Sequence, residues 1–392
     1  MGDIIERFQN TYKRDNYKVV YSPYRICPLG AHVDHQHGWV TGMALDHGIE
    51  FVFSPREDGY IRISSADFPD EEMFHIDQVP AYIPGSWGNY MRGAVLALQS
   101  RYRLRYGLDG VAHGNLPIGG LSSSAAVSSA YLLALADVNG LNISRKELIE
   151  LSSYIENEYI GLNNGILDQA SNLLSRDGYL LYLDTRTEEY ELVKKPDNMP
   201  DFEVAVVYSG ISKTLISTDY NNRVDECKAA AWFMQAATSD EISSFKEVRL
   251  RDIDEHIYEM VVAELPERFR KRARHFFEEN KRVREGVKAW KEGDIKKFGQ
   301  LMFQSGESSI QNYECGCPEL ISIYEILRET PGIYGARFSG AGYRGCCIGL
   351  IDPSYKDIIK EKVTKEYLKK YPHLEGVFQV DFCKTDDGAR IL

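Results

Sequence analysis

The sequence predicts an α+β protein in which helices cover antiparallel sheets. Segments in which apolar and polar residues alternate, separated by glycine-containing turns, occur in both halves of the chain. Segments with apolar residues at helical spacing lie between them. The 392 residues also exceed the length at which one hydrophobic core usually keeps growing. We therefore expect two lobes, residues 1–200 and 201–392, with a cleft between them.

The first half predicts strands followed by helices. After a strand over YKVVYSP, we expect meandering antiparallel strands over WVTGMALDHGIEFVFSPREDGYIRISS, where glycines break the alternation. Helical spacing predicts helices over SWGNYMRGAVLALQSRY and LSSSAAVSSAYLLALADVNG. A further helix is expected over NISRKELIELSSYIENEYIG, with Ser144 and Glu147 forming a capping box and Gly161 at its end. Glu156 then lies late in a well-defined helix.

The second half predicts two strands, a long helical stretch and a final group of strands. The strands GYLLYLD and FEVAVVYSG precede helices over about 221–328, and YGARFSG, RGCCIGLI and FQVDFC form the final group. Within the helical stretch, ERFRKRARHFFEENKRVREGVKAWKEG mixes both charge signs around Phe269, Phe276, Phe277 and Val283. This pattern predicts a helix with a solvated charged face.

Charge and composition limit the classes of partner. A formal net charge of -12 argues against a nucleic-acid or anionic-membrane surface, because both require a basic footprint. The apolar runs are shorter than a membrane span, and the N-terminus MGDIIERFQNTYKR is charged instead of signal-like. The seven cysteines lack the spacing of zinc knuckles or of a disulfide framework, which predicts reduced thiols. We expect a soluble, cytoplasmic protein with no nucleic-acid, membrane or obligate protein partner.

Four histidine or aspartate residues crowd the segment PYRICPLGAHVDHQHG, at 23–38: His32, Asp34, His35 and His37. A metal site is one interpretation, although the segment has no helical His-x-x-x-His pair and forms a turn after a strand. The floor of a pocket for a polar ligand is the other. We expect His35 and His37 to be turn and packing residues instead of ligands.

A phosphate site is predicted where NLPIGGLSSSAAVSSAYLLAL joins a glycine turn to three serines and a helix. Glycines let the backbone approach a ligand, and a helix N-terminus offers unpaired N–H groups and the positive end of its dipole. A serine-capped buried helix without a ligand is the alternative.

Other nucleotide-binding classes fit poorly. The chain has no Gly-Lys dipeptide for a Walker A loop, and no His-Arg-Asp or Asp-Phe-Gly for a protein kinase. The run from Gly340 to Gly345 matches the dinucleotide fingerprint GxGxxG, but the β-prone CCIGLI and Asp-Pro follow it. We expect this loop to turn between two strands, which leaves a Rossmann dehydrogenase as a remote alternative.

Six segments, in this order, resemble the GHMP kinases, the superfamily of galactokinase, homoserine kinase, mevalonate kinase and phosphomevalonate kinase. They are PYRICPLGAHVDHQHGWVTGMAL, NLPIGGLSSSAAV, IENEYIGLNNGILDQ, DYNNRVDEC, SSIQNYECGCPEL and FSGAGYRGCCIGL, and they cover essentially the whole chain. The resemblance implies an N-terminal lobe like ribosomal protein S5 domain 2 and a ferredoxin-like C-terminal lobe. It also implies ATP-dependent phosphorylation of a sugar's anomeric hydroxyl in the cleft.

The resemblance assigns roles to particular residues. Asp168 matches the catalytic base, and Arg25 matches the arginine that stabilises developing charge and keeps the aspartate ionised. Ser124 and Glu156 match the Mg²⁺ ligands, and both offer hard oxygen donors. The remaining matches are the sugar-contacting Ala31, His32, Asp34, Gly165 and Tyr220; the ATP-contacting Gly119, Gly120, Leu121, Ser122, Ser123, Ser124 and Trp87; and Gly340, Gly342 and Arg344 of the third loop.

One departure points to the substrate. Galactokinases carry Gly-Glu-His-Thr-Asp where this chain has Gly30-Ala31-His32-Val33-Asp34, and their glutamate contacts the 6-hydroxyl of galactose. A glutamate facing a C6 carboxylate would form a like-charge pair that costs on the order of several kcal/mol. Ala31 therefore suggests galacturonic acid as the substrate. The phrases YRICPLGAH, DHQ, YGARFSGAG and RGCC also resemble those of the galacturonokinases within the family.

Several alternatives stay open at this point. Galactose is the nearest alternative substrate, with water replacing the lost contact to its 6-hydroxyl. A catalytically silent sugar sensor is more remote, since the four residues assigned to the reaction and the metal are all retained. Four cations could neutralise the uronate: Arg344, Arg223, Lys213 and Arg92. Arg344 replaces a glycine of ordinary galactokinases, and it could instead face a nucleotide phosphate. Ile118 stands in the ATP loop where glycine is common, which puts the tightness of the phosphate cradle in question.

Overall fold

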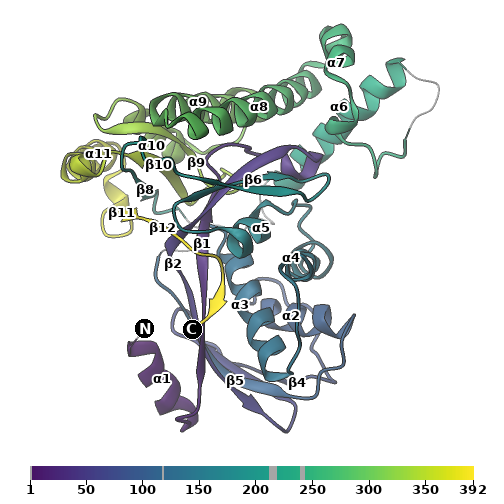
Figure 1. The fold of residues 1–392 in the computed structure, drawn as a ribbon, viewed down its shortest axis with the longest axis vertical. Helices are drawn as coiled ribbons and strands as arrows, with labels where there is room; N and C mark the ends of the chain where they lie inside the picture. Colours follow the sequence, from purple (N-terminus) through teal and green to yellow (C-terminus); the bar gives the residue numbers. More distant parts are fainter. Residues whose placement is uncertain (1, 117–118, 212–218, 239–242) are drawn as a thin grey trace.

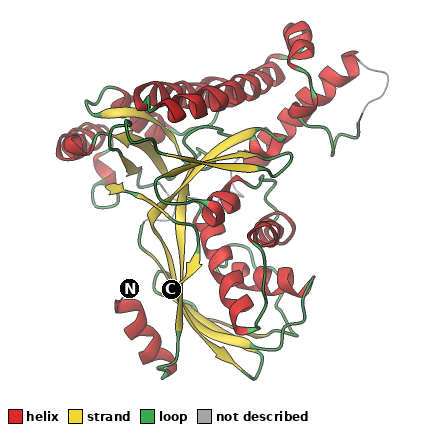
Figure 2. Ribbon diagram, viewed as in Figure 1, coloured by secondary structure: helices red, strands yellow, loops and turns green. Residues whose placement is uncertain are grey.

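The structure is a computed structural model that describes residues 2–116, 119–211, 219–238 and 243–392 (Figure 1). Two sheets, one of nine strands and one of four, carry helices on their faces (Figure 2). The predicted α+β class is therefore confirmed. Within the part of the chain that is described, none of the helices combines the length and the apolar character needed to cross a bilayer.

The larger sheet has the strand order β13-β1-β2-β5-β3-β4, and β12 and the β6–β7 pair also join β2. Its strands are β1 Lys18–Ile26, β2 Trp39–Arg56, β3 Tyr60–Ser65, β4 Glu72–His75, β5 Gly107–Gly114, β6 Tyr179–Asp184, β7 Tyr190–Lys194, β12 Thr385–Asp386 and β13 Arg390–Ile391. The long β2 is the centre of the sheet, because β1, β5, β6 and β12 all pair with it.

The predicted meander after residue 39 is wrong in two respects. β2 continues through Gly42 and Gly48, and β3 pairs in parallel with β5 instead of antiparallel with β2. The glycines serve close approach: a side chain at Gly42 would collide with Ser171, and one at Gly48 would collide with the backbone of Ser22. Glycine in a strand therefore marks a backbone contact here and not a turn.

Helices cover both faces of this sheet. On one face α3 and α5 pack against β1 and β2, and α2 and α4 pack against α3; on the other, α1 packs against β5 and β2 (Figure 1). Their bounds are α1 Gly2–Tyr12, α2 Asn89–Gln99, α3 Ser123–Val138, α4 Arg145–Tyr154 and α5 Leu167–Leu174. The predicted helices after residues 86, 121 and 144 are thus confirmed.

The third of these helices ends differently from its prediction. The Ser144 hydroxyl caps α4 by accepting the N–H of Glu147 (3.2 Å), but the Glu147 carboxylate accepts the hydroxyl of Tyr102 (2.7 Å) instead of completing the box. The last turns, η2 Ile155–Ile160, are π-helical, and Gly161 ends them with a φ of 86°. Glu156 consequently lies in a widened turn, a feature that is frequent at functional sites.

The four-stranded sheet is antiparallel, with the order β11-β8-β10-β9. Its strands are β8 Glu203–Tyr208, β9 Ile333–Phe338, β10 Cys346–Ile351 and β11 Gln379–Cys383. Counted along the chain, the order is 4-1-3-2, and helices follow the first and third strands. This is the ferredoxin-like βαββαβ arrangement that was predicted for the second lobe.

Two helices of this half, α8 and α9, lie side by side (Figure 1). α9 and α10 pack against β9, and α11 packs against α10 and β11. Their bounds are α6 Tyr220–Thr238, α7 Glu255–Val261, α8 Glu267–Glu292, α9 Ile295–Ser308, α10 Pro318–Arg328 and α11 Lys356–Lys370.

The end of the chain returns to the first sheet, where β12 and β13 pair with β2 and β1. One hydrophobic core also runs continuously beneath both sheets. The division at residues 200 and 201 stays a prediction, and residues 385–391 lie with the first lobe in space.

The prediction that the charges of α8 are solvated is wrong for one face of this helix. Arg272 and Glu279 are completely buried and share a stripe with Phe276 and Val283. Arg272 is neutralised there by Glu226, whose carboxylate oxygen is 2.7 Å from its Nε. The local pattern of both signs did not reveal these partners, which come from other elements.

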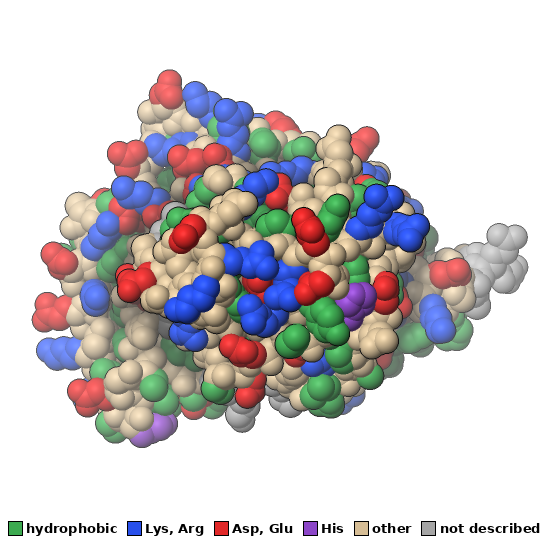
Figure 3. Space-filling view, turned by 90° about the horizontal axis from the view of Figure 1, so that it is seen from below, with side chains coloured by type: hydrophobic (Ala, Val, Ile, Leu, Met, Phe, Trp, Pro, Cys, Tyr) green, Lys and Arg blue, Asp and Glu red, His purple; other side chains and the backbone are tan. Residues whose placement is uncertain are grey.

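Opposite charges also meet at the lower end of the large sheet. The carboxylate of Asp109, in β5, is buried and forms ion pairs of 2.9 to 3.0 Å with Arg14, Arg56 and Arg62. On the surface seen from below, Lys and Arg side chains are likewise intermingled with Asp and Glu (Figure 3). Arginines in this region are therefore neutralised locally.

Candidate active site

A cavity of about 530 Å³ lies between the glycine-rich loops of the two halves. Of the residues predicted from the sequence, it is lined by Arg25, Trp87, Gly119, Gly120, Ser122, Ser123, Ser124, Asp168, Gly340, Gly342 and Arg344. Segments up to 320 positions apart in the sequence thus meet around one space, which is large enough for a nucleotide-sized ligand.

The centre of the cavity wall is a three-residue polar group. Arg25 donates from Nε to Oδ1 of Asp168 (2.7 Å), and the Ser122 hydroxyl donates to Oδ2 (2.6 Å). Both residues line the cavity, and the carboxylate of Asp168, 23% exposed, is more accessible than the 3% exposed Arg25 side chain. An ionised carboxylate in this position can accept a proton from a bound ligand.

Local backbone geometry holds these side chains in place. Asp168 lies in the first turn of α5, and Arg25 follows an irregularity in the pairing of β1 with β2. Arg25 also donates its backbone N–H to the carbonyl of Leu121 (3.2 Å) and Nη1 to the carbonyl of Gly120 (3.1 Å). The loop before α3 is therefore tied to the strand that carries Arg25. Leu121 itself is buried and does not line the cavity.

The loop before α3 needs its glycines. Gly119 and Gly120 have φ values of 143° and 84°, which side chains rarely adopt, and Ser122 has a φ of 59°. A side chain at Gly345 would come within 2.5 Å of the Gly119 carbonyl carbon. The third glycine-rich loop turns between β9 and β10, as expected, and packs directly on the phosphate loop. Ile118 lies outside the described residues.

Glu156 forms a second acidic group beside this loop. It is 1% exposed, and its Oε2 accepts hydrogen bonds from Asn164 and from Gln169 (2.7 Å). Oε1 has no hydrogen-bond partner among the described residues. Burial, and then the charge of Asp168, raises the pKa of Glu156 to about 7, while the Ser124 hydroxyl lowers it. An orphaned carboxylate oxygen near a serine hydroxyl is a donor set that suits a hard divalent cation.

The predicted sugar-contacting residues lie together beside Asp168. A side chain at Gly165 would come within 2.6 Å of Oδ2 of Asp34. Burial and the charge of Asp168 raise the pKa of Asp34 to about 6. Burial, and then the charges of Asp34, Asp168 and Glu156, raise the pKa of Tyr220 well above its ordinary value. Tyr220, at the start of α6, therefore lies within electrostatic range of all three carboxylates.

His32 lies deeper than these residues. Its ring stacks on Tyr313 with a centroid distance of 4.0 Å, and its Nε2 is 3.6 Å from the Cys315 sulfur. Burial lowers the pKa of His32 well below its ordinary value, so its ring is neutral at physiological pH. A neutral ring can bind hydroxyl groups without repelling nearby cations.

The other histidines of the segment have local roles. His35 is buried against the Tyr313 hydroxyl (3.2 Å), and His37 closes a short 3-10 turn, η1 Asp34–Gln36, with a φ of 62°. Among the described residues, the only group of three potential ligands close enough to share an ion is Asp46, His47 and Cys383, away from this segment. The metal interpretation of residues 32–37 is therefore not supported.

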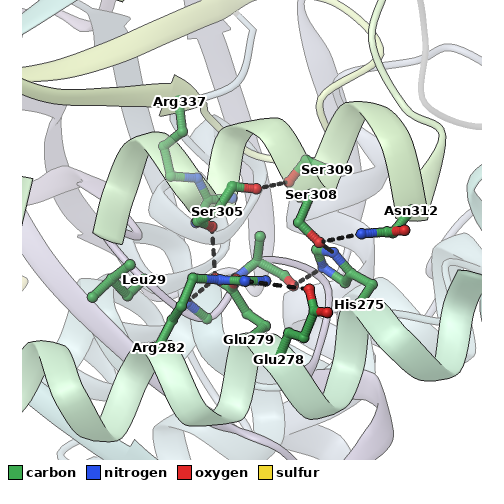
Figure 4. Close-up of polar contacts among 12 residues, drawn as sticks. Leu29, His275, Glu278, Glu279, Arg282, Ser305, Ser308, Ser309, Asn312 and Arg337 are labelled. Carbon is green, nitrogen blue, oxygen red and sulfur yellow. Dashed lines mark hydrogen bonds and ion pairs between the residues drawn. The ribbon is translucent and has the colours of Figure 1, made fainter. Parts of the chain in front are cut away.

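A buried polar cluster that includes Glu279, Arg282 and His275 of α8 (Figure 4) contacts the backbone of Ala31. Oε1 of Glu279, on α8, accepts the backbone N–H groups of Gly30 (2.8 Å) and Ala31 (3.1 Å), and Oε2 accepts from Arg282 (2.7 Å). His275 contacts the carbonyl of Ala31 through Nε2 (2.8 Å). Both backbone groups of Ala31 are thus bound by α8, so the position of residue 31 is fixed.

Replacing Glu279 with glutamine should destabilise the protein strongly. The amide nitrogen would face the Arg282 guanidinium, and because both groups are hydrogen-bond donors, neither would find an acceptor. The Arg282 cation would also lose its buried negative partner. We expect the free energy of unfolding to fall by about 3 kcal/mol, measured by urea denaturation. Glu278→Gln is the matched control, because Glu278 is half exposed and lies 3.6 Å from Arg282. It should cost less than about 0.5 kcal/mol; equal losses for the two variants would refute the structural role of Glu279.

The structure separates the three candidate cations that it describes. Arg92 is buried in a two-pronged ion pair with Glu72 (2.7 Å for both contacts). Arg223 pairs with Glu226 (3.1 Å) and lies 3.5 Å from the carbonyl oxygen of Glu314. Arg344 lines the cavity. Lys213 lies outside the described residues.

Sequence reasoning missed several residues of the site. Tyr313 and Cys315 fall in a segment that was assigned only as downstream, and Glu279 and His275 in a helix taken as solvated. One signal for Glu279 was available: the spacing of Phe276, Glu279 and Val283 puts a carboxylate in an apolar stripe. Nothing in the sequence indicated that two aromatic residues, Phe68 and Tyr90, line the cavity. The ring of Phe68 is stacked on that of Trp87, with 6.3 Å between the ring centroids.

Comparison with protein families gives two matches. Residues 89–176 match the family described as GHMP kinases N terminal domain, and residues 286–370 match GHMP kinases C terminal. The first range contains the phosphate loop, Glu156 and Asp168, and the second contains the third glycine-rich loop.

Similar proteins of the same length extend these matches to the whole chain. A galacturonokinase of Arabidopsis thaliana is 43% identical over 96% of this chain and 93% of its own. A galactokinase of Roseiflexus sp. (strain RS-1) is 33% identical over 99% of this chain and 96% of its own. The crystal structure of Lactococcus lactis galactokinase complexed with galactose superposes with a TM-score of 0.90, at 27% identity, over 99% of this chain and 98% of the other.

Proposed function

The chain belongs to the GHMP kinases, and we propose that it transfers the γ-phosphate of ATP to the anomeric hydroxyl of D-galacturonic acid, giving galacturonate 1-phosphate and ADP. The observation that carries the choice of sugar is Ala31. It occupies the position of the galactokinase glutamate, and Glu279 and His275 bind its backbone. An acidic C6 group could approach this position without meeting a carboxylate side chain. The 43% identity to a galacturonokinase supports the same choice.

We assign the proton transfer to Asp168. As the C1 oxygen attacks the γ-phosphorus, its proton passes to the carboxylate, the new P–O bond forms, and the bond to the bridging oxygen of ADP breaks. Arg25 holds Oδ1 and the Ser122 hydroxyl holds Oδ2, so the carboxylate is oriented before the sugar arrives. The buried Arg25 charge would also stabilise negative charge that develops on the phosphoryl oxygens.

Mg²⁺ fits the donor set of Ser124 and Glu156. The orphaned Oε1 of Glu156 and the nearby Ser124 hydroxyl would hold the ion, while Asn164 and Gln169 fix the other carboxylate oxygen. When bound, the ion would neutralise phosphate charge and keep its remaining positions for water and phosphate oxygens. Because burial raises the pKa of Glu156 to about 7, a nearby cation would favour the ionised form that ligation requires.

The residues that line the cavity are suited to binding ATP. The N-terminus of α3 and the glycines before it offer backbone N–H groups to phosphates, and Trp87, Phe68 and Tyr90 offer aromatic faces to the base. The sugar would lie on the other side of Asp168, beside Asp34 and Tyr220. Asp168 would then lie beside the point where the two substrates meet, so that the C1 hydroxyl could face the γ-phosphate while donating its proton to the carboxylate.

Galactose is the second candidate substrate, favoured by the structural similarity to a galactokinase that holds galactose. A silent sensor is disfavoured, because the Arg25–Asp168 pair and the Glu156 oxygen are placed for reaction. A coupled assay of ADP release, with galacturonate and galactose at matched concentrations, tests the proposal. We expect the higher kcat/KM for galacturonate. A higher value for galactose would refute the uronate assignment, and no ADP release with either sugar would refute the kinase activity.

A further inference from the structure

We infer that Arg344 is a nucleotide-binding residue, and that its guanidinium holds a phosphate group of ATP on the side of the cavity away from the sugar. This inference rests on the proposed kinase function and adds a residue to it. The alternative ligand for the same cation is the C6 carboxylate of the uronate. Four observations favour the phosphate.

The first observation is the position of Arg344 in the loop. Gly345 follows it directly, and a side chain at Gly345 would collide with the backbone of Gly119 and Gly120. The nearest approach of the third loop to the phosphate loop is thus one residue from Arg344. A guanidinium at this point can reach anions that are held by the N–H groups of residues 119–124.

The second observation is the set of residues that share the cavity wall with Arg344. Trp87, Tyr90 and Ser124 line the same cavity. These residues are proposed to hold the base and the phosphates of ATP, so Arg344 lies on the nucleotide side of the site.

The third observation is that the residues proposed to contact the sugar lie outside this wall. The described lining of the cavity includes Arg344 but not Ala31, Asp34 or Tyr220. This arrangement argues against a contact between Arg344 and the C6 carboxylate.

The fourth observation is the charge balance of the cavity. Its described lining residues include Arg25, His113 and Arg344 as potential cations, and no lysine. Arg25 is paired with Asp168, and His113 lies 2.9 Å from Asp67. No ion pair joins Arg344 to a carboxylate among the described residues, and this half-buried residue lines the cavity. It is the cation that remains available to a polyphosphate.

Equilibrium titrations with nucleotides test the inference without a sugar present. For Arg344→Gln, the dissociation constants of ATP and ADP should rise about 10- to 100-fold, because a charge-assisted contact is lost. That of adenosine should not change. Arg344→Lys should give an intermediate loss, since it keeps the charge but not the planar fork. Arg105→Gln, which removes a charge outside the cavity, is the control and should bind like the parent protein.

Two results would overturn the inference. One is unchanged ATP and ADP affinity in a folded Arg344→Gln protein, shown by an unaltered thermal transition. The other is a selective rise of the KM for galacturonate, which would assign Arg344 to the uronate instead. Because the titrations need no sugar turnover, their result stands even if the assay with galacturonate and galactose contradicts the proposed function.

Discussion

Replacing Asp168 with asparagine should lower kcat by about 10²- to 10⁴-fold, the contribution expected of a positioned general base. The structure gives the reason: this carboxylate is the acidic group at the centre of the cavity wall, with Arg25 and Ser122 already bound to it. Asparagine can still accept from Arg25 through its carbonyl oxygen, and the Ser122 hydroxyl can reverse to accept from the amide. The substitution removes the capacity to take a proton and the negative charge that neutralises Arg25, while the hydrogen bonds that position the side chain remain.

ATP binding should therefore persist in Asp168→Asn, measured by equilibrium titration alongside the kinetics. Asp137→Asn is a suitable control, because it removes the same charge from a partly exposed pair with Lys18 outside the cavity. It should leave kcat unchanged. Retention of more than about a tenth of the parent kcat by Asp168→Asn, far above the loss expected for a base, would exclude Asp168 from that role.

Local signals predicted much of the fold. α2, α3 and α4 follow from helical spacing and capping, and β8 to β11 from short apolar runs between turns. These patterns depend only on residues within a few positions of one another, so they can be recognised in a single sequence. The turn between β9 and β10 was also predicted, because the residues after Gly345 are suited to a strand and not to a helix.

Features that depend on distant partners could not be predicted. The parallel pairing of β3 with β5 joins residues across a helix, and the glycines of β2 serve contacts with other elements. Glu279 contacts Gly30 across 249 positions in the sequence. A charged residue on an amphipathic helix is usually solvated, and only the tertiary structure supplies the backbone N–H groups and the arginine that make this one stable when buried.

The candidate site was accessible from the sequence because the resemblance covers the whole chain. The resemblance assigned Arg25, Ser124 and Asp168 to one site, and in the structure all three residues line one cavity. The resemblance could not rank the four cations, since each arginine looked equally available. Only the three-dimensional structure distinguishes them, through the ion pair of Arg92 with Glu72 and the place of Arg344 in the cavity wall.

Replacing Ala31 with glutamate should change the sugar preference. Ala31 is 3% exposed, and Glu279 holds its backbone N–H, so a new carboxylate would extend from a fixed position toward the sugar. Facing a C6 carboxylate, it would form a like-charge pair shielded from water, while the 6-hydroxyl of galactose could donate to it. We expect kcat/KM for galacturonate to fall on the order of 100-fold more than that for galactose, measured in the same coupled assay.

Ala31→Gln separates charge from size, because glutamine has the same shape without the charge. If repulsion causes the change, the ratio of the two kcat/KM values should shift much less in Ala31→Gln than in Ala31→Glu. If both variants shift it equally, crowding of the C6 group explains the preference and the electrostatic argument fails.

Arg282 compensates the nearby Glu279 directly, with 2.7 Å between Nε and Oε2, and so leaves a second carboxylate at residue 31 without a dedicated partner. The repulsion should consequently grow with pH as the new side chain ionises, whereas a steric effect should not.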